Sequence, residues 1–426
     1  MKIFLRLVAS LAVFGSLAAL YLLPAPQALS EATVDSQLVG VEPLPLQSGC
    51  PGPLVEVGGV QGTDLGEIAR IGAPLVAVHG AELDPEQGWA RFEVAGSPQS
   101  TQLLSANQVQ SVDRPRIRGL AAANCGQPNN YGYFVSGNSG PGNESILILG
   151  NPNQVEVLVE VELTLATEVI SERVPVAAGA QKEISLVALS GAEPIFALSY
   201  RTSGLAVSAY MQHRTVNGLT ATGVDLVAPQ LARKVGVLPG IEVVTEGFAP
   251  AELRVFNPSL EQAAVVLQLK NSEQVEEIRL MVPAGELLSQ KLSLAAGANL
   301  VSFESDQPVV LALKNQILDE GLDFSWMVPT DGFAEPLRLV VSRTSTLFIA
   351  NPESGDLTVI IQGPENQSAI VPGQGQVGIA VKPGSYLISS AEAFHALLSI
   401  KNSTGYATIA PTQMRNFGEE LKVSVR

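Results

Sequence analysis

Short apolar runs that stop at an Asn-Pro dipeptide recur three times along the chain. They read ILILGNP at 146–152, LRVFNP at 253–258 and LFIANP at 347–352. Proline holds the preceding residue in extended geometry and cannot continue a strand ladder, while asparagine bonds its own local backbone. Each dipeptide therefore predicts the end of a β-strand and the turn that follows it.

A second strand is predicted after each Asn-Pro dipeptide. Valines at 155, 157, 159 and 161 alternate with mostly acidic residues, which is the period of two of a strand with one buried and one wet face. Residues 264–270 and 357–362 are its counterparts in the later copies. Each copy then has a Val-Pro turn, and we expect apolar strands near its end, at 194–198, 308–313 and 394–400.

The copies have the length of a compact β-sandwich. The Asn-Pro dipeptides begin at 151, 257 and 351, so the period is about 100 residues, which is typical of an immunoglobulin-like domain. We therefore predict an all-β protein with tandem immunoglobulin-like β-sandwich repeats after an N-terminal membrane-directed helix. The expected parts are a signal peptide or membrane anchor at 1–32, a partial β unit with a disulfide at 38–130, sandwich repeats at 131–228, 236–330 and 337–412, and a C-terminal tail at 413–426.

The N-terminus has the pattern of a membrane-directed segment. Lys2 and Arg6 precede 17 uncharged residues, from Leu7 to Leu23, and Pro24 ends the run. This run fits either a cleaved signal peptide or a retained anchor. Because the basic end stays in the cytoplasm, both alternatives place the rest of the chain outside it. We expect a protein that is secreted or anchored to the cytoplasmic membrane by its N-terminus.

The two cysteines, Cys50 and Cys125, form an even pair in a chain that is expected to be exported. Such a pair predicts one disulfide. It would close a loop of about 75 residues and stabilise the fold by roughly 4 kcal/mol through chain entropy. Two free buried thiols are the alternative.

Composition narrows the class of function. Hydrophobic residues make up 46% of the 426 residues and charged residues only 15%, which argues against disorder. Acidic residues outnumber basic ones 41 to 25, which gives a formal net charge of −16. So acidic a surface repels phosphate backbones, and nucleic acid is not an expected partner.

Candidate catalytic and metal-binding patterns each have a simpler structural interpretation. The Gly-rich stretch 373–378 has the spacing of a dinucleotide fingerprint, but it falls at a turn and precedes a strand-like segment. Ser139 with His79 and Asp113 resembles a protease triad only faintly, because the spacing is compressed. The histidines lie in different units, and the acidic residues at 319–323 match no calcium loop. We expect a hairpin loop around Ser139, a solvated acidic turn at 319–323, no cofactor and no metal.

One basic cluster interrupts this acidic chain. Arg114, Arg116 and Arg118 alternate, which predicts that all three lie on one face of a strand. Such a row can clamp an anionic polymer or a lipid headgroup through bidentate contacts, or it can pair with nearby acids. These arginines are the candidate binding residues.

Several short motifs occur together with the repeats. They are Cys-Pro-Gly-Pro at 50–53, Cys-Gly-Gln-Pro at 125–128 and Tyr-Phe-Val-Ser-Gly at 133–137. With the N-terminal apolar segment, they resemble a family of uncharacterised actinobacterial secreted or membrane-anchored envelope proteins. Members commonly have a tryptophan where Tyr133 stands. The resemblance implies an envelope location and supplies no catalytic residues.

The repeats and the export segment favour a non-catalytic extracytoplasmic scaffold or binding protein of the cell envelope. Its partner would be a cell-wall or envelope polymer or a membrane protein. An accessory subunit of a membrane envelope-synthesis complex and an exported hydrolase acting on wall material are the alternatives.

Overall fold

The computed structural model describes residues 36–40, 45–58, 68–82, 89–94, 103–272, 274–317, 323–415 and 420–424. The chain divides into two compact units, one of Met1–Glu42 with Gly418–Arg426 and the other of Pro43–Phe417. In the first unit, β1 (Ser36–Gly40) pairs antiparallel with β32 (Glu420–Ser424). The predicted membrane-directed segment 1–32 lies outside the described residues, among which no helix is both long and apolar enough to cross a bilayer.

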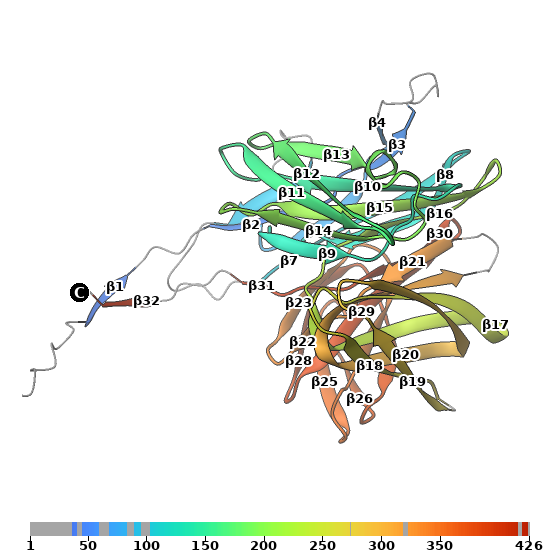
Figure 1. The fold of residues 1–426 in the computed structure, drawn as a ribbon. Helices are drawn as coiled ribbons and strands as arrows, with labels where there is room; N and C mark the ends of the chain where they lie inside the picture. The colour runs from blue at the N-terminus through green and yellow to red at the C-terminus, as the bar shows by residue number, and fades with distance from the viewer. Residues whose placement is uncertain are drawn as a thin grey trace, which may run out of the picture. The chain divides into compact units, whose positions relative to one another are not determined.

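Strands dominate the second unit, in several antiparallel sheets, which confirms the predicted all-β class (Figure 1). Within the described residues of this unit, one short helix occurs, α2 (Val187–Ser190). Gly191 ends it in the left-handed conformation.

The first sandwich packs two four-stranded sheets face to face. Its strands are β9 (Tyr131–Phe134), β10 (Asn143–Gly150), β11 (Val157–Thr164), β12 (Val169–Val176), β13 (Gln181–Ser185), β14 (Ala197–Thr202), β15 (Ser208–Asn217) and β16 (Thr220–Val227). The sheet orders are β13-β10-β15-β16 and β12-β11-β14-β9. On β11, Val157, Val159 and Val161 are buried while Leu158 and Glu160 are exposed, so the predicted alternation is confirmed from Val157 onward. Val155 precedes the strand and is exposed, so the prediction is wrong for this residue.

The second sandwich contains two long strands that pair with each other more than once. Its strands are β17 (Arg233–Phe256), β18 (Ala263–Lys270), β19 (Val275–Val282), β20 (Leu287–Ile317) and β21 (Asp323–Met327). The first half of β17 pairs with residues 301–304 of β20. The second half lies between two other parts of β20, so that Val255 pairs with Leu288 on one side and with Leu311 on the other. β20 also pairs with β18 and with β21.

The third sandwich has the same strand arrangement as the first. Its strands are β22 (Gly332–Phe333), β23 (Leu337–Val341), β24 (Ser345–Ala350), β25 (Leu357–Gln362), β26 (Gln367–Val371), β27 (Gln376–Val381), β28 (Gly384–Ser390), β29 (Phe394–Asn402) and β30 (Gly405–Ile409). β24 lies between β27 and β29, as β10 lies between β13 and β15. β25 lies between β26 and β28, as β11 lies between β12 and β14.

The asparagines of the three Asn-Pro dipeptides are buried and make the same bonds. Asn257 Nδ2 donates to the carbonyls of Glu261 (2.7 Å) and Val282 (3.0 Å), and its Oδ1 accepts the N–H of Ser259 (3.1 Å). Asn151 and Asn351 repeat these bonds with the corresponding residues. The side chain thus ties its own turn to the end of β12, β19 or β26, which confirms the predicted strand end.

The N-terminal part, residues 46–124, forms two two-stranded sheets and most of one four-stranded sheet. Its strands are β2 (Leu46–Gly49), β3 (Leu54–Val57), β4 (Ile68–Ile71), β5 (Leu75–His79), β6 (Arg91–Val94), β7 (Leu103–Arg114) and β8 (Ile117–Asn124), and β31 (Met414–Arg415) joins β7. Glutamine side chains hold β3 against its surroundings. Val55 N–H donates to Gln212 Oε1 (2.8 Å), Gln212 Nε2 donates back to Val55 O (2.7 Å), and Leu54 N–H donates to Gln110 Oε1 (2.9 Å). These bonds attach β3 both to β7 and to the first sandwich.

Candidate functional site

Four β-hairpins of the described part meet at the buried carboxylate of Asp323. They are β7–β8, β15–β16, β20–β21 and β29–β30. Oδ2 of Asp323 accepts the backbone N–H of Leu120 in β8 (2.9 Å) and of Tyr406 in β30 (2.9 Å). Oδ1 accepts the N–H of Val224 in β16 (3.2 Å). One side chain of the second sandwich therefore bonds to the N-terminal part and to the other two sandwiches.

Glycine stands immediately before each of these three donors. A Cβ placed on Gly119, Gly223 or Gly405 would lie 2.6, 2.8 or 1.8 Å from an oxygen of Asp323. A side chain at any of these positions would therefore collide with the carboxylate. Three hairpins leave space at corresponding positions, and the fourth hairpin fills that space with Asp323.

Burial dominates the electrostatics of this junction. Asp323 is 3% exposed, and burial raises the pKa of its carboxyl to about 7, although the backbone N–H donors act in the opposite direction. Burial also raises the pKa of Asp225 in β16 well above its usual range, although Oδ2 of Asp225 accepts the Trp326 N–H (2.6 Å). Burial lowers the pKa of Lys314 to about 8, and its Nζ lies 4.0 Å from the centroid of the Phe324 ring.

Beside this junction, Arg254 of β17 reaches from the second sandwich to the first. Its side chain is 1% exposed, its Nε donates to Glu252 Oε1 (2.7 Å), and its guanidinium also donates to the carbonyl of Gly137. The guanidinium carbon lies 4.7 Å from the centroid of the Trp326 ring, and Trp326 Nε1 donates to His213 Nδ1 (2.9 Å). The buried guanidinium is ion-paired and hydrogen-bonded, and it connects the second sandwich to the first. Shifted pKa values alone do not make it a catalytic site.

The predicted solvated acidic turn at 319–323 is wrong for Asp323. Its carboxylate points into the junction because backbone donors from three other strands converge there. Asp319 and Glu320 lie outside the described residues. Across the part of the chain that the structure describes, no three His, Cys, Asp or Glu side chains are placed to hold a metal ion together.

The predicted row of arginines on one strand face is also wrong. Arg114 ends β7, Arg116 lies in the turn, and Arg118 belongs to β8. The proline between the first two cannot continue the ladder, so the chain reverses there. Arg116 forms an ion pair with Glu56 (3.2 Å) and Arg118 with Asp113 (3.6 Å). For these two arginines, the structure therefore shows the alternative interpretation, which is pairing with nearby acidic residues. A binding role for the three arginines stays a prediction.

The residues of the faint protease pattern are not brought together. His79 pairs with Ser105 of β7, and Asp113 lies eight residues further along that strand, about 26 Å at 3.3 Å per residue. Ser139 is buried in the loop between β9 and β10, where its N–H donates to Glu193 O (3.3 Å). These two strands belong to different sheets, so the expected hairpin loop is wrong. The Gly-rich stretch 373–378 begins in the turn between β26 and β27, as predicted, and its residues from Gln376 onward belong to β27.

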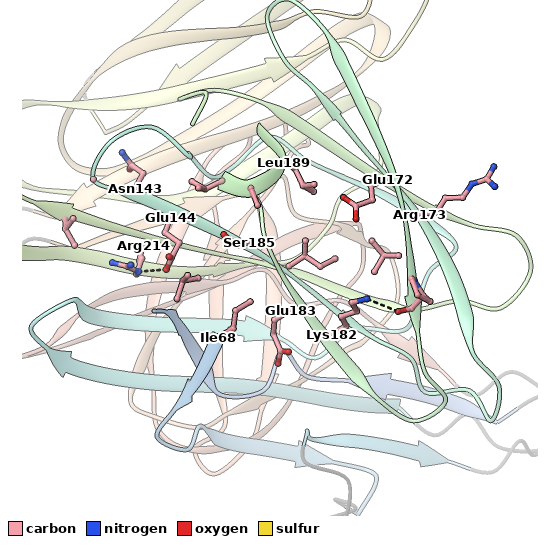
Figure 2. A pocket seen from close by; sticks show the side chains of 18 residues that line it. Ile68, Asn143, Glu144, Glu172, Arg173, Lys182, Glu183, Ser185, Leu189 and Arg214 are labelled. Atoms are coloured by element: carbon pink, nitrogen blue, oxygen red, sulfur yellow. Dashed lines mark hydrogen bonds and ion pairs between the residues drawn. The ribbon is translucent and has the colours of Figure 1, made fainter. Parts of the chain in front are cut away.

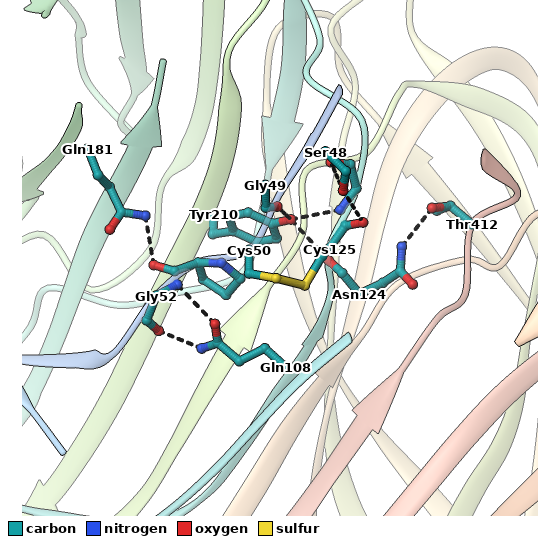
Figure 3. The surroundings of a disulfide bond; sticks show 12 residues. Ser48, Gly49, Cys50, Gly52, Gln108, Asn124, Cys125, Gln181, Tyr210 and Thr412 are labelled. Carbon is teal, nitrogen blue, oxygen red and sulfur yellow. Dashed lines mark hydrogen bonds between the residues drawn. A yellow bond between two sulfur atoms is a disulfide. The ribbon is translucent and has the colours of Figure 1, made fainter. Parts of the chain in front are cut away.

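Cys50 and Cys125 form the predicted disulfide, and both are fully buried (Figure 3). The bond joins the end of β2 to the end of β8. Tyr210 packs over it, donates its O–H to Gly49 O (2.7 Å) and accepts the N–H of Gly126 (2.9 Å). The disulfide thus lies where the N-terminal part contacts β15 of the first sandwich.

A groove of about 730 Å³ opens along one edge of the first sandwich (Figure 2). Its apolar lining comes from β3, β4, β12, β13 and the segment after β13, and includes Val57, Ile68, Val174, Ile184 and Leu189. Two ion pairs involve its lining residues, Glu144 with Arg214 (2.5 Å) and Glu183 with Arg70 (2.7 Å). Lys182 Nζ donates to Pro175 O (3.3 Å) and so ties β13 to β12. Sequence reasoning missed this groove because its walls come from segments that are far apart in the chain.

The family model that matches this chain is a family of unknown function (DUF5719), and it covers residues 92–385. The chain belongs to this family. The DUF5719 match contains the junction residues Gly119, Gly223 and Asp323 and most of the groove lining. An actinobacterial origin and an envelope location stay predictions. No curated protein matches the chain.

Three solved structures are similar to parts of the DUF5719 chain. A mutant of the major pilin from Streptococcus pyogenes has 8% identity, covers 63% of this chain and 98% of its own, and gives a TM-score of 0.16. Bacteroides uniformis beta-glucuronidase 2 has 8% identity, with 75% and 34% coverage and a TM-score of 0.16. The chicken CNTN1 FN1–FN3 domains have 12% identity, with 68% and 100% coverage and a TM-score of 0.10.

Proposed function

We propose that this DUF5719 protein is a non-catalytic scaffold or binding protein of the cell envelope, with immunoglobulin-like sandwiches as its repeated units. The observation that carries the proposal is the bonding of three sandwiches and the N-terminal part to the one carboxylate of Asp323. A carboxylate that accepts this many backbone N–H groups holds surfaces and loops in fixed relation. Such fixed geometry suits a scaffold that presents binding surfaces.

Two further observations support an extracytoplasmic location. The disulfide between Cys50 and Cys125 belongs to oxidising compartments outside the cytoplasm. The basic and apolar pattern of residues 1–32 fits export, and the basic end fits a cytoplasmic N-terminus. Together they support the proposal that the sandwiches of the scaffold lie on the outer side of the cytoplasmic membrane.

Co-sedimentation of residues 33–426 with isolated actinobacterial cell-wall material tests the proposal. We expect saturable binding that weakens as salt is added, and no release of soluble wall fragments. If the arginines at 114, 116 and 118 contact an anionic polymer, their joint replacement by alanine lowers the bound fraction, whereas Arg279→Ala on β19 does not. Enzymatic release of wall fragments would favour the exported hydrolase. Absence of binding would favour the accessory subunit of a membrane complex.

A further inference from the structure

Each sandwich ends one of its sheets with an equivalent strand. These strands are β12, β19 and β26, which pair with β11, β18 and β25 and, in the described part of the chain, with no strand on their other side. One row of backbone N–H and C=O groups on each strand therefore faces away from its sheet. Such a row is a template for pairing with an added strand.

Two of these edges carry the features that prevent strand pairing, and the third does not. β12 has the sequence VISERVPV, with two charged side chains and a proline, and β19 has the sequence VEEIRLMV, with three charged side chains. Charge and proline are common protections of sheet edges. β26 has the sequence QSAIV, which contains neither. Of the three edges, β26 is therefore the one that is open to pairing.

β26 also exposes apolar surface. Ile370 is 66% exposed, and Ile360 of β25, which lies opposite Ser368 on the same outer face, is 49% exposed. Another terminal strand of this sandwich, β27, is uncharged as well, but its exposed residues are only Gly378 and Ala380. β26 therefore gains apolar burial when it pairs, whereas β27 has no large exposed side chain to bury.

The charges around β26 select a second copy of this chain as the partner. The net charge is −16, so two copies repel each other and approach most easily where charge is absent. Residues 366–381 contain no charged side chain, and the charged residues that bound this stretch, Glu365 and Lys382, pair with each other. The best complement of an uncharged strand with an exposed isoleucine is another such strand, and β26 is itself one.

The antiparallel register that pairs all five residues of β26 has its two-fold axis at Ala369. Ser368 of one copy then lies opposite Ile370 of the other on the outer face, and the two copies of Ile370 become diagonal neighbours. Because Ile360 lies opposite Ser368 on β25, the partner's Ile370 meets Ile360 across a small side chain. Four isoleucines, two from each copy, thus cluster on the outer face of the joined sheets.

We propose that β26 pairs antiparallel with β26 of a second copy of this chain, which joins the two third sandwiches through one continuous sheet. The contact is isologous, because each copy contributes the same strand. Five residue pairs make a small interface, so we expect a weak dimer whose fraction rises with protein concentration. This contact does not depend on what the chain binds.

Disulfide trapping in the full chain tests the register. The native cysteines are bonded to each other, so Ala369→Cys supplies a single free thiol. At the two-fold axis, the Cα atoms of the two copies are about 4.5–5.5 Å apart, which is within the range of a disulfide. We expect a covalent dimer under mild oxidation. Thr358→Cys, exposed on β25, is the control, because three strand spacings hold its two copies at least about 14 Å apart and no dimer should form.

Sedimentation velocity of the full chain tests the chemistry of the contact. Wild type should associate more strongly as salt is added, because screening weakens the repulsion between two acidic chains. Ser368→Lys should weaken the association by about tenfold or more, because it sets two ammonium groups on diagonal positions of the paired strands. Gln362→Lys is the control, since it adds the same charge to the outer face at the end of β25, where it pairs with no residue of β26.

Three results would overturn the proposal. The first is that Ala369→Cys yields no more covalent dimer than Thr358→Cys, which would leave this edge to a strand of a different protein. The second is that Ser368→Lys and Gln362→Lys change the association equally, which would place the contact between copies elsewhere. The third is that the amides of β26 exchange slowly at every protein concentration in a chain that stays monomeric, which would mean that another segment of the same chain covers the edge.

Discussion

The carboxylate of Asp323 accepts the backbone N–H of Leu120 at 2.9 Å, across 203 residues of sequence. The same carboxylate also accepts the N–H groups of Val224 and Tyr406. Backbone donors that are buried in a junction need partners within the protein. Three hairpins therefore share one acceptor side chain, which the fourth hairpin supplies.

Replacing this side chain should destabilise the whole sandwich assembly. Asp323→Ala leaves three buried N–H groups without their acceptor, and each such loss costs about 1–3 kcal/mol. We expect the free energy of unfolding to fall by on the order of 4 kcal/mol, measured by urea denaturation near pH 7. Glu276→Ala, at an exposed site on β19, should change it by less than about 0.5 kcal/mol. Equal effects of the two variants would contradict the role of Asp323.

The raised pKa of Asp323 predicts a pH dependence of stability. The carboxyl titrates near pH 7 in the folded chain and near its ordinary value of 3.8 when unfolded. Between these values the folded state holds a proton that the unfolded state does not, so the free energy of unfolding falls as pH rises from about 4 to 7. The slope is at most about 1.4 kcal/mol per pH unit. Urea denaturation of wild type and Asp323→Ala at pH 5, 6, 7 and 8 checks this, because only wild type contains the carboxyl group. The difference in the free energy of unfolding between the two proteins should become smaller as pH rises toward 7. A difference that widens with pH would show that the N–H donors outweigh burial.

The disulfide should contribute to the stability of the second unit. It joins residues 75 apart, so the chain-entropy contribution is about 4 kcal/mol. We expect the double variant Cys50→Ser, Cys125→Ser to unfold at a lower urea concentration, with a free energy of unfolding that is lower by about 4 kcal/mol. Native wild type should resist alkylation, since both cysteines are fully buried and bonded. Rapid labelling of two thiols in the native protein would contradict the pairing.

The Asn-Pro asparagines should be structural. Asn257→Ala removes a buried side chain that donates to the carbonyls of Glu261 and Val282, and should cost about 2–3 kcal/mol in thermal or urea unfolding. Gln362→Ala, at an exposed site on β25, is the control and should be nearly neutral. The corresponding change at Asn151 or Asn351 should have a similar cost. A neutral effect at all three positions would mean that these bonds are replaced by water.

The local features of the fold could be predicted from sequence, because they depend on neighbours along the chain. β10 ends at Gly150 and β24 at Ala350, directly before their Asn-Pro dipeptides, since proline and asparagine act on the adjacent backbone. The alternation of β11 follows from its own residues. The equivalence of strands between copies was harder to predict. In the sequence pattern, the strands expected at 194–198 and 394–400 are equivalent. The first falls at the start of β14, whereas the second is β29. The true equivalent of β29 in the first sandwich is β15, because β15 pairs with β10 as β29 pairs with β24.

The candidate sites could not be predicted, because they depend on residues far apart in sequence. Asp323 sits beside other acidic residues in the sequence, which suggests a wet turn. Its burial follows from N–H groups at 120, 224 and 406. The sequence did contain one signal of this junction. Gly119, Gly223 and Gly405 lie in the second strands of their hairpins, and glycine inside a strand often marks a place where another group approaches closely. The proline after Arg114 likewise signalled the turn that separates the three arginines.

Native-state amide hydrogen exchange tests the central claim most directly. We predict that the amides of Leu120, Val224 and Tyr406 exchange slowly in wild type and that all three become fast together in Asp323→Ala. The amides of Val159 and Val161, inside the core of the first sandwich, should keep their protection. Unchanged protection of the three junction amides in the variant would contradict the account, because it would show that the hairpins are held together without Asp323.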